Sequence, residues 1–147
     1  MNLSKACKIV RVMNAVAGGF GDVQYGSSVD LKGFGAVAFV ALFGALADTS
    51  AAKLKAQQST DDAVADAFAD LVGTGLDIGT AHDNKLVVLE IQNPRERYVR
   101  PAIVRATANV VIDGVVAFLF KADKEPVTAD TTVAASELHH APAEGTA

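Results

Sequence analysis

The only concentration of basic side chains in this sequence lies around residue 98. It consists of Arg95, Arg97, Arg100 and Arg105, with Tyr98 between them. The planar guanidinium of arginine binds carboxylates through paired hydrogen bonds, and tyrosine adds an amphipathic ring. The stretch is therefore either an interface with the carboxylates of a partner or a solvated hairpin that neutralises Glu90 and Glu96. We retain both interpretations, with Arg95, Arg97, Tyr98 and Arg100 as candidate interface residues.

Residues that could bind a metal are present, but their spacing is unsuitable. The histidines His82, His139 and His140 have no carboxylates at metal-binding spacing on a rigid element. Four aspartates between residues 61 and 70 fit one face of a helix, and such a set is more often a solvated acidic face than a cation site. We expect no cofactor and no metal.

Signatures of nucleophilic or nucleotide chemistry are also missing from the sequence. The glycine clusters at 18–21 and 33–35 match neither the dinucleotide-binding fingerprint nor the phosphate-binding loop, and they are interpreted as turns. No Gly-x-Ser-x-Gly elbow occurs. We therefore expect a protein that is not an enzyme.

Two long apolar runs, residues 34–46 and 114–121, must form the centre of the scaffold. A strand in a two-layer fold turns alternate side chains inward and outward, so one parity should be polar. In both runs both parities are apolar, and the outward half therefore needs a partner. This pattern predicts self-association, and it adds Phe39, Phe43, Phe118 and Phe120 to the candidate interface residues.

Composition limits the alternatives further. A chain of 147 residues fits one domain, and 50% hydrophobic residues indicate a globular protein. The net charge of −4, with scattered basic residues, argues against nucleic-acid binding. The lone Cys7 is interpreted as a small buried residue. No targeting segment is recognisable, and the apolar run is shorter than the ~20 residues of a spanning helix, so we expect no membrane association and synthesis in a cytoplasm.

The rest of the chain fits an all-β protein. Strands are predicted at 8–16, 28–31, 34–46, 53–58, 85–92, 98–107 and 114–121, most of them joined by hairpins, including one between 34–46 and 53–58. Pro101 implies an edge position or a bulge. A short helical segment is predicted near 61–71. The expected architecture is an antiparallel β-sandwich, jelly-roll-like, over residues 1–124.

Residues 125–147 change in character. They contain two prolines, many Ala and Thr, and few large apolar residues. Such a composition cannot build a core, so we expect an extended C-terminal arm that contributes to partner binding.

Several segments together resemble a known family. They are GFGAVAFVALFG at 33–44, LKAQQSTD at 54–61, RYVR at 97–100, and GVVA at 114–117 followed by KADKEP at 121–126. This order, over about residues 8–126, resembles the capsid cement or decoration proteins of tailed bacteriophages. The acidic segment 60–71 is not matched.

The resemblance implies a non-enzymatic virion structural protein with a jelly-roll-like fold. Such a protein binds the exterior of the capsid, often as a homo-oligomer, with the major capsid protein as its partner, and stabilises contacts between subunits. An alternative is a phage tail or baseplate module that recognises a host-surface glycan, although such a site usually exposes Trp or Tyr, and this chain has no Trp and two Tyr. Nothing in the sequence supports or excludes an accessory domain of an enzyme.

Overall fold

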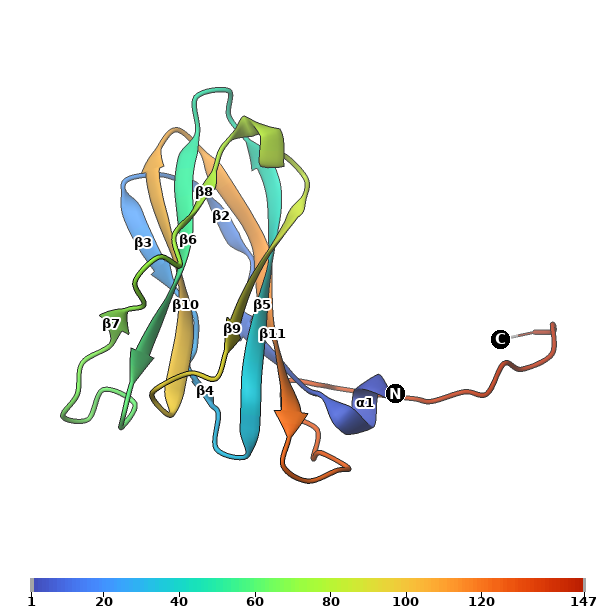
Figure 1. The fold of residues 1–147 in the computed structure, drawn as a ribbon. Helices are drawn as coiled ribbons and strands as arrows, with labels where there is room; N and C mark the ends of the chain where they lie inside the picture. The colour runs from blue at the N-terminus through green and yellow to red at the C-terminus, as the bar shows by residue number, and fades with distance from the viewer. Residues whose placement is uncertain (1, 147) are drawn as a thin grey trace.

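Residues 2–146, which the computed structural model describes, form two antiparallel sheets that pack face to face (Figure 1). Sheet A has the order β1 (Lys8–Met13), β11 (Val110–Ala122), β5 (Phe34–Leu46) and β9 (Leu86–Gln92), and β2 (Val16–Gly19) also pairs with β11. Sheet B has the order β3 (Asp22–Tyr25), β10 (Tyr98–Thr107), β6 (Ala51–Ser59) and β7 (Ala69–Asp70), with β4 (Val29–Asp30) also on β10 and β8 (Leu76–Ile78) also on β6. The predicted antiparallel β-sandwich is thus confirmed.

The connections follow a jelly roll. If β1/β2, β3/β4 and β7/β8 each count as one interrupted strand, sheet A holds positions 1, 8, 3 and 6 and sheet B holds positions 2, 7, 4 and 5. Nearly every connection therefore crosses between the sheets. The prediction that most strands are joined by hairpins, including the one between β5 and β6, is therefore wrong, because strands joined in this way lie in different sheets. Alternation along a strand shows which face is inward, but it does not show which strand pairs with it.

The core consists of the inward-facing side chains of both sheets. Its largest fully buried members include Phe39, Phe43, Leu54, Ile103, Ile112 and Leu119. Phe39 and Phe43 are 0% and 2% exposed, so neither can contact a partner surface in the folded protein. Their prediction as interface residues is corrected here. On β5 they belong to the inward parity.

Proline in the centre of sheet B depends on an interruption in the neighbouring strand. Pro101 lies on β10, which has strands on both sides, and the pairing of Pro101 with β6 is regular, so neither the predicted edge position nor the predicted bulge is present. Its carbonyl accepts the Gly26 N–H at 2.9 Å, in the gap between β3 and β4. The missing N–H of Pro101 points to the same gap, where no strand needs it. A Cβ on Gly26 would lie 2.6 Å from the proline ring, so only glycine fits there.

The helix predicted near 61–71 is absent, and an irregular loop leads into β7 instead. The Asp61 carboxylate accepts hydrogen bonds from the N–H groups of Val64, Ala65 and Asp66, at 3.1, 2.8 and 3.1 Å. Asp62 and Ala63 have φ values of 60° and 65°, in the left-handed region that a right-handed helix excludes. The Asp61 side chain thus closes a loop instead of capping a helix. The same N–H donors, that of Asp66 first, lower the pKa of Asp61.

The two ends of the chain meet beside β1. The short helix α1 (Leu3–Ala6) precedes it, and the Val127 N–H donates to the Lys5 carbonyl at 2.8 Å. Asp130 pairs with Lys8 at 3.4 Å, and Thr132 Oγ1 accepts the Arg11 N–H at 2.9 Å. Beyond this point the chain leaves the sandwich as an extended segment (Figure 1). The region predicted as an arm therefore has a proximal part, residues 125–132, held against the domain, and a distal part, residues 133–146.

Within residues 2–146, no helix has the length and apolar character needed to cross a membrane.

Candidate functional site

The outward-facing side of sheet A is mostly apolar, and we call it face A. Its side chains are Ile9 and Arg11 on β1, Val116, Phe118 and Phe120 on β11, Ala36, Ala38, Val40 and Leu42 on β5, and Leu86, Val88, Glu90 and Gln92 on β9. Register aligns Val116, Val40 and Val88 in one row, with Leu42 and Leu86 in the next. Leu86, Val88 and Leu42 are 58%, 49% and 39% exposed. The doubly apolar pattern of the sequence thus leaves an open apolar surface.

The chain covers one end of face A itself. Leu3, Ala6 and Cys7 line a pocket together with Phe118 and Phe120. Both phenylalanines are consequently half-buried, although they point outward as predicted. Cys7 is buried, as the sequence indicated, and burial raises the pKa of its thiol. Whether Phe118 and Phe120 contact a partner stays a prediction.

Two of the predicted interface arginines already have partners within the domain. Arg97 forms a paired contact with Asp30, with Nε–Oδ1 and Nη2–Oδ2 distances of 2.8 and 2.6 Å, and it lies 5.0 Å from the centre of the Tyr98 ring. The Arg97 guanidinium lowers the pKa of the Asp30 carboxyl. Arg95, by contrast, makes no hydrogen bond or ion pair with any residue that the structure describes. It is the member of the cluster that is available to another molecule.

Arg100 lies between two aromatic rings. Its guanidinium carbon is 4.3 Å from the centre of the Tyr25 ring and 4.1 Å from that of Phe68, and its Nε donates to Gln57 Oε1 at 2.9 Å. Cationic groups this close to aromatic faces are attracted electrostatically. Arg100 therefore joins β3, β6 and the loop before β7, whatever else it contacts.

Arg105 is separated from the cluster by burial. It is 5% exposed, pairs through Nε and Nη2 with Asp22, and donates from Nη1 to the carbonyls of Ala17 and Val110 at 2.8 and 3.1 Å. The Arg105 guanidinium lowers the pKa of the Asp22 carboxyl. The sequence carried a signal for this position, since Arg105 shares its parity on β10 with the core residues Val99 and Ile103.

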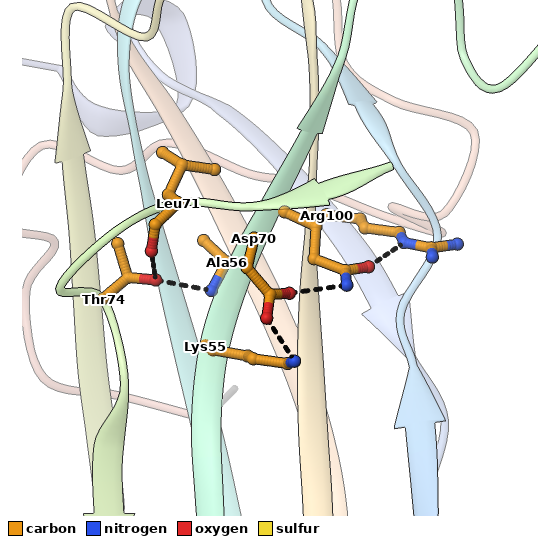
Figure 2. A network of polar contacts seen from close by, with 7 residues as sticks. Lys55, Ala56, Asp70, Leu71, Thr74 and Arg100 are labelled. Carbon is orange, nitrogen blue, oxygen red and sulfur yellow. Dashed lines mark hydrogen bonds and ion pairs between the residues drawn. The ribbon is translucent and has the colours of Figure 1, made fainter. Parts of the chain in front are cut away.

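We call the outward side of sheet B face B. Along β6 and β7 it is polar, and its side chains pair with each other (Figure 2), whereas Val23 and Val104 form an apolar part on β3 and β10. Asp70 Oδ2 contacts Lys55 Nζ at 2.7 Å, its Oδ1 accepts from Gln57 Nε2 at 2.7 Å, and Gln57 in turn accepts from Arg100. Lys55 first, and then Gln57, lowers the pKa of Asp70. Lys53 and Asp77 form a further pair at 3.3 Å. These contacts join β7 and β8 to β6 and β10.

A second contact in Figure 2 fixes the chain between β7 and β8. Thr74 Oγ1 accepts the Ala56 N–H at 3.2 Å and donates to the Leu71 carbonyl at 2.8 Å. The Leu71 N–H donates to the Ala56 carbonyl at 3.0 Å. One threonine hydroxyl thus replaces a strand partner where β7 has ended.

The histidines are not brought together. His82 lies on the 3-10 helix η1 (Thr80–His82), where its Nδ1 accepts the Gly79 N–H at 3.1 Å. His139 pairs with Glu137 at 2.9 Å on the distal arm. In the described part of the chain, no three His, Cys, Asp or Glu side chains are arranged to hold a metal ion.

Comparisons with known proteins identify no family for this chain. No family model matches this sequence, and no curated protein is significantly similar to it. Among solved structures, the CBM22-1 xylan-binding domain of Xyn10C from Paenibacillus barcinonensis is similar over 78% of this chain and 87% of its own, with 16% identity and a TM-score of 0.42. At this identity and TM-score, the similarity says nothing about what the present protein binds.

Proposed function

We propose that this protein is a non-enzymatic virion structural protein that binds the outer surface of a phage capsid and stabilises contacts between major capsid subunits. The observation that supports this proposal best is the divided arm. Residues 127, 130 and 132 are held by α1 and β1, whereas residues 133–146 extend away from the sandwich (Figure 1). A segment that packs on nothing in its own domain is suited to lie on a neighbouring subunit.

The reach of the distal arm fits this role. Its 14 residues span at most about 46–50 Å when fully extended. A domain bound to one capsid subunit thereby gains a second attachment on the next one. Because the second contact forms at high effective concentration, the two together hold more strongly than either alone.

Stabilisation then follows from geometry. A shell under internal pressure fails where subunits separate, and a bridging protein adds an interface that must break first. The sandwich is suited to this role because it has a closed core and because the proximal arm is attached to it at β1. Catalysis has no part in this mechanism.

The test uses purified capsids that lack the protein. The full chain should co-sediment with them and raise the temperature at which they release DNA. Deleting residues 134–147 should weaken attachment by at least about tenfold, or about 1.4 kcal/mol. It should leave the melting temperature of the isolated protein unchanged, since the described part of that segment makes no hydrogen bond or ion pair to the sandwich.

A longer deletion, of residues 126–147, is the matched control. It also removes the contacts of Val127, Asp130 and Thr132, so it should lower the melting temperature as well as the attachment. Undiminished attachment after the shorter deletion would contradict the role of the distal arm. Failure of the full chain to bind any capsid would contradict the proposed function.

The second candidate, a glycan-binding module, is favoured by one observation. Tyr25 is 53% exposed on face B, next to Arg100 and close to Lys55 in register. An exposed ring beside convergent polar groups is a common element of ligand sites. Under this alternative the protein binds a host glycan on an array, Tyr25→Ala abolishes that binding, and capsids are not bound.

A further inference from the structure

Face A has room for a partner at one end only. The α1 helix closes the end near Phe118 and Phe120, while the rows of Val40 and Leu42 are left open with exposed Leu86 and Val88 beside them. Exposed apolar patches of this kind generally mark sites where proteins associate. The remaining question is which surface fits it.

The positions of the charged residues on face A indicate which surface fits it. Arg11 lies on the edge strand β1, in register with the row Val116, Val40 and Val88, while Glu90 lies on the opposite edge strand, β9. Both side chains are exposed. The Arg11 guanidinium has no carboxylate within ion-pair distance among residues 2–146, and Glu90 contacts Gln92 alone. One face therefore carries a positive and a negative charge on its two edges with an apolar centre between them.

We infer that face A binds face A of a second copy of this chain, about a two-fold axis that runs parallel to the strands. This rotation places β1 of one copy over β9 of the other and β11 over β5. Arg11 then faces Val88 of the second copy. It reaches Glu90 two residues further along the strand, a step of about 7 Å. Symmetry forms the pair twice, one on each side of the buried apolar rows.

Charge complementarity also selects the direction of the axis. A two-fold axis perpendicular to the strands, in the plane of the interface, would place β1 over β1 and Arg11 against Arg11. Like charges opposed across an interface are unfavourable, so this alternative is disfavoured. The first orientation uses all four strands and leaves no charge on face A unpaired.

The size of the surface sets the expected strength. Four strands are about 19 Å wide, and the rows of Leu42, Val40 and Glu90 extend about 20 Å along them. Because α1 covers the Phe118 part of the third row, the footprint is at most about 400 Å² per copy. Stable specific complexes bury about 800 Å² per partner. We therefore expect a weak dimer, with a dissociation constant in the micromolar range.

Sedimentation velocity of the full chain from about 1 to about 200 µM tests this inference. The unmodified protein should shift from monomer to dimer across this range. Val88→Lys, which places a charge in the centre of the surface, should be monomeric throughout. The matched control is Lys53→Glu on face B, where a charge is reversed at similar exposure, and this variant should dimerise normally. Circular dichroism melts establish that each variant is folded.

Two charge reversals test the axis. Arg11→Glu and Glu90→Arg should each weaken the dimer by at least about tenfold, because like charges then oppose each other twice. An equimolar mixture of the two variants should restore the dimer, because the mixed pair forms both attractive contacts again. With β1 over β1, each single reversal would only exchange one like-charge contact for another, so it would not weaken the dimer. Weakening by both single variants together with rescue in the mixture therefore identifies the proposed axis.

A monomer at all concentrations, or a dimer that persists in Val88→Lys, would overturn the inference. Weakening by both single variants without rescue in the mixture would overturn the proposed axis. These experiments use the isolated protein, so their failure leaves the capsid proposal standing, and failure of capsid attachment leaves the dimer standing.

Discussion

Faces A and B belong to the same sandwich, but they differ in whether their charged side chains have partners within the chain. On face B, Asp70 is bonded to Lys55 and Gln57, and Lys53 to Asp77, so most charges have a partner on the next strand. On face A the centre is apolar, and Arg11 and Glu90 are too far apart to meet. The charged side chains of β6, β7 and β8 on face B therefore find partners within one chain. On face A, the apolar rows and the charges of Arg11 and Glu90 are open to a second surface.

The two faces therefore differ in how much they contribute to the stability of the single domain. Cross-strand pairs on face B tie the short strands β7 and β8 to β6, and thereby contribute to the stability of the single domain. The outward side chains of face A contribute less to that stability, because much of their surface stays in water. Four predictions sharpen this comparison, in order of decreasing effect on the free energy of unfolding.

The largest effect should come from Phe39 on β5, and its neighbour Val40 serves as the comparison. Phe39→Ala removes a fully buried ring and should lower the free energy of unfolding by about 3–5 kcal/mol. Val40→Ala, on face A, should lower it by less than about 1 kcal/mol. Urea unfolding at low protein concentration measures both. Equal losses would mean that face A is part of the core and that the comparison fails.

Next in size is the removal of the arginine that links the strands of face B. Arg100→Ala leaves Gln57 Oε1 without its donor and separates Tyr25 from Phe68, so it should destabilise the protein by about 1–2 kcal/mol. Arg95→Ala serves as control and should change the stability by no more than about 0.5 kcal/mol. The same urea measurement applies. If the two variants behave alike, the contacts of Arg100 do not stabilise face B.

Acid should distinguish the two faces. The pKa of Asp70 is lowered in the folded protein by Lys55 and Gln57, so below about pH 4 the unfolded chain takes up its proton first. This contribution is present above the unfolded pKa and is lost as the pH falls through the folded one. Asp70→Asn should therefore flatten the acid side of the melting-temperature profile. Val88→Ala on face A should shift the profile equally at every pH, and a change in its slope would contradict the assignment.

The smallest effect is expected for the exposed pair of Lys53 and Asp77. Exposed ion pairs contribute little because water and salt screen them, so Lys53→Ala should change the free energy of unfolding by about 0–0.5 kcal/mol. Thermal melts at low and high salt measure this. A larger, salt-dependent loss would show that the pairs of face B act as a network.

The sequence was sufficient for the long strands but not for the short strands β3, β7 and β8, for the segment near 61–71, or for which strands pair with each other. The apolar alternation of β5 and β11 placed both strands, but it assigned Phe39 and Phe43 to a surface, because each parity looked equally apolar. Pro101 was expected at an edge or a bulge, since a gap between β3 and β4 is a property of the partner strands and not of β10. Hydrogen bonds that the Asp61 carboxylate accepts from the following N–H groups overrode the helical spacing of that segment.

The sequence likewise identified part of the candidate site and missed the rest. Four neighbouring arginines suggested one surface. Three of them are instead bound within the chain by residues far away in sequence: Arg97 by Asp30, Arg100 by Gln57 and Arg105 by Asp22. Their pairing depends on tertiary structure that charge counting does not contain. Parity on β10 separates Arg105 from Arg100, whereas Arg95 and Arg97 precede the strand. For face A, in contrast, the apolar outward parity was visible in the sequence from the beginning.

The attachment of the proximal arm to β1 also determines how this protein resists fibre growth. Strands add to a sheet at its free edges, and a growing fibre needs two of them per molecule. In sheet A the edge at β1 is occupied, because Thr132 takes the Arg11 N–H and Ser27 donates to the Val12 carbonyl at 2.7 Å. On the other side of sheet A, the outer edge of β9 has no strand partner in the part of the chain that the structure describes, and β2 pairs with β11 alone. Strand addition at β1 requires the proximal arm to detach first, so edge-to-edge growth through this sheet is hindered on the β1 side.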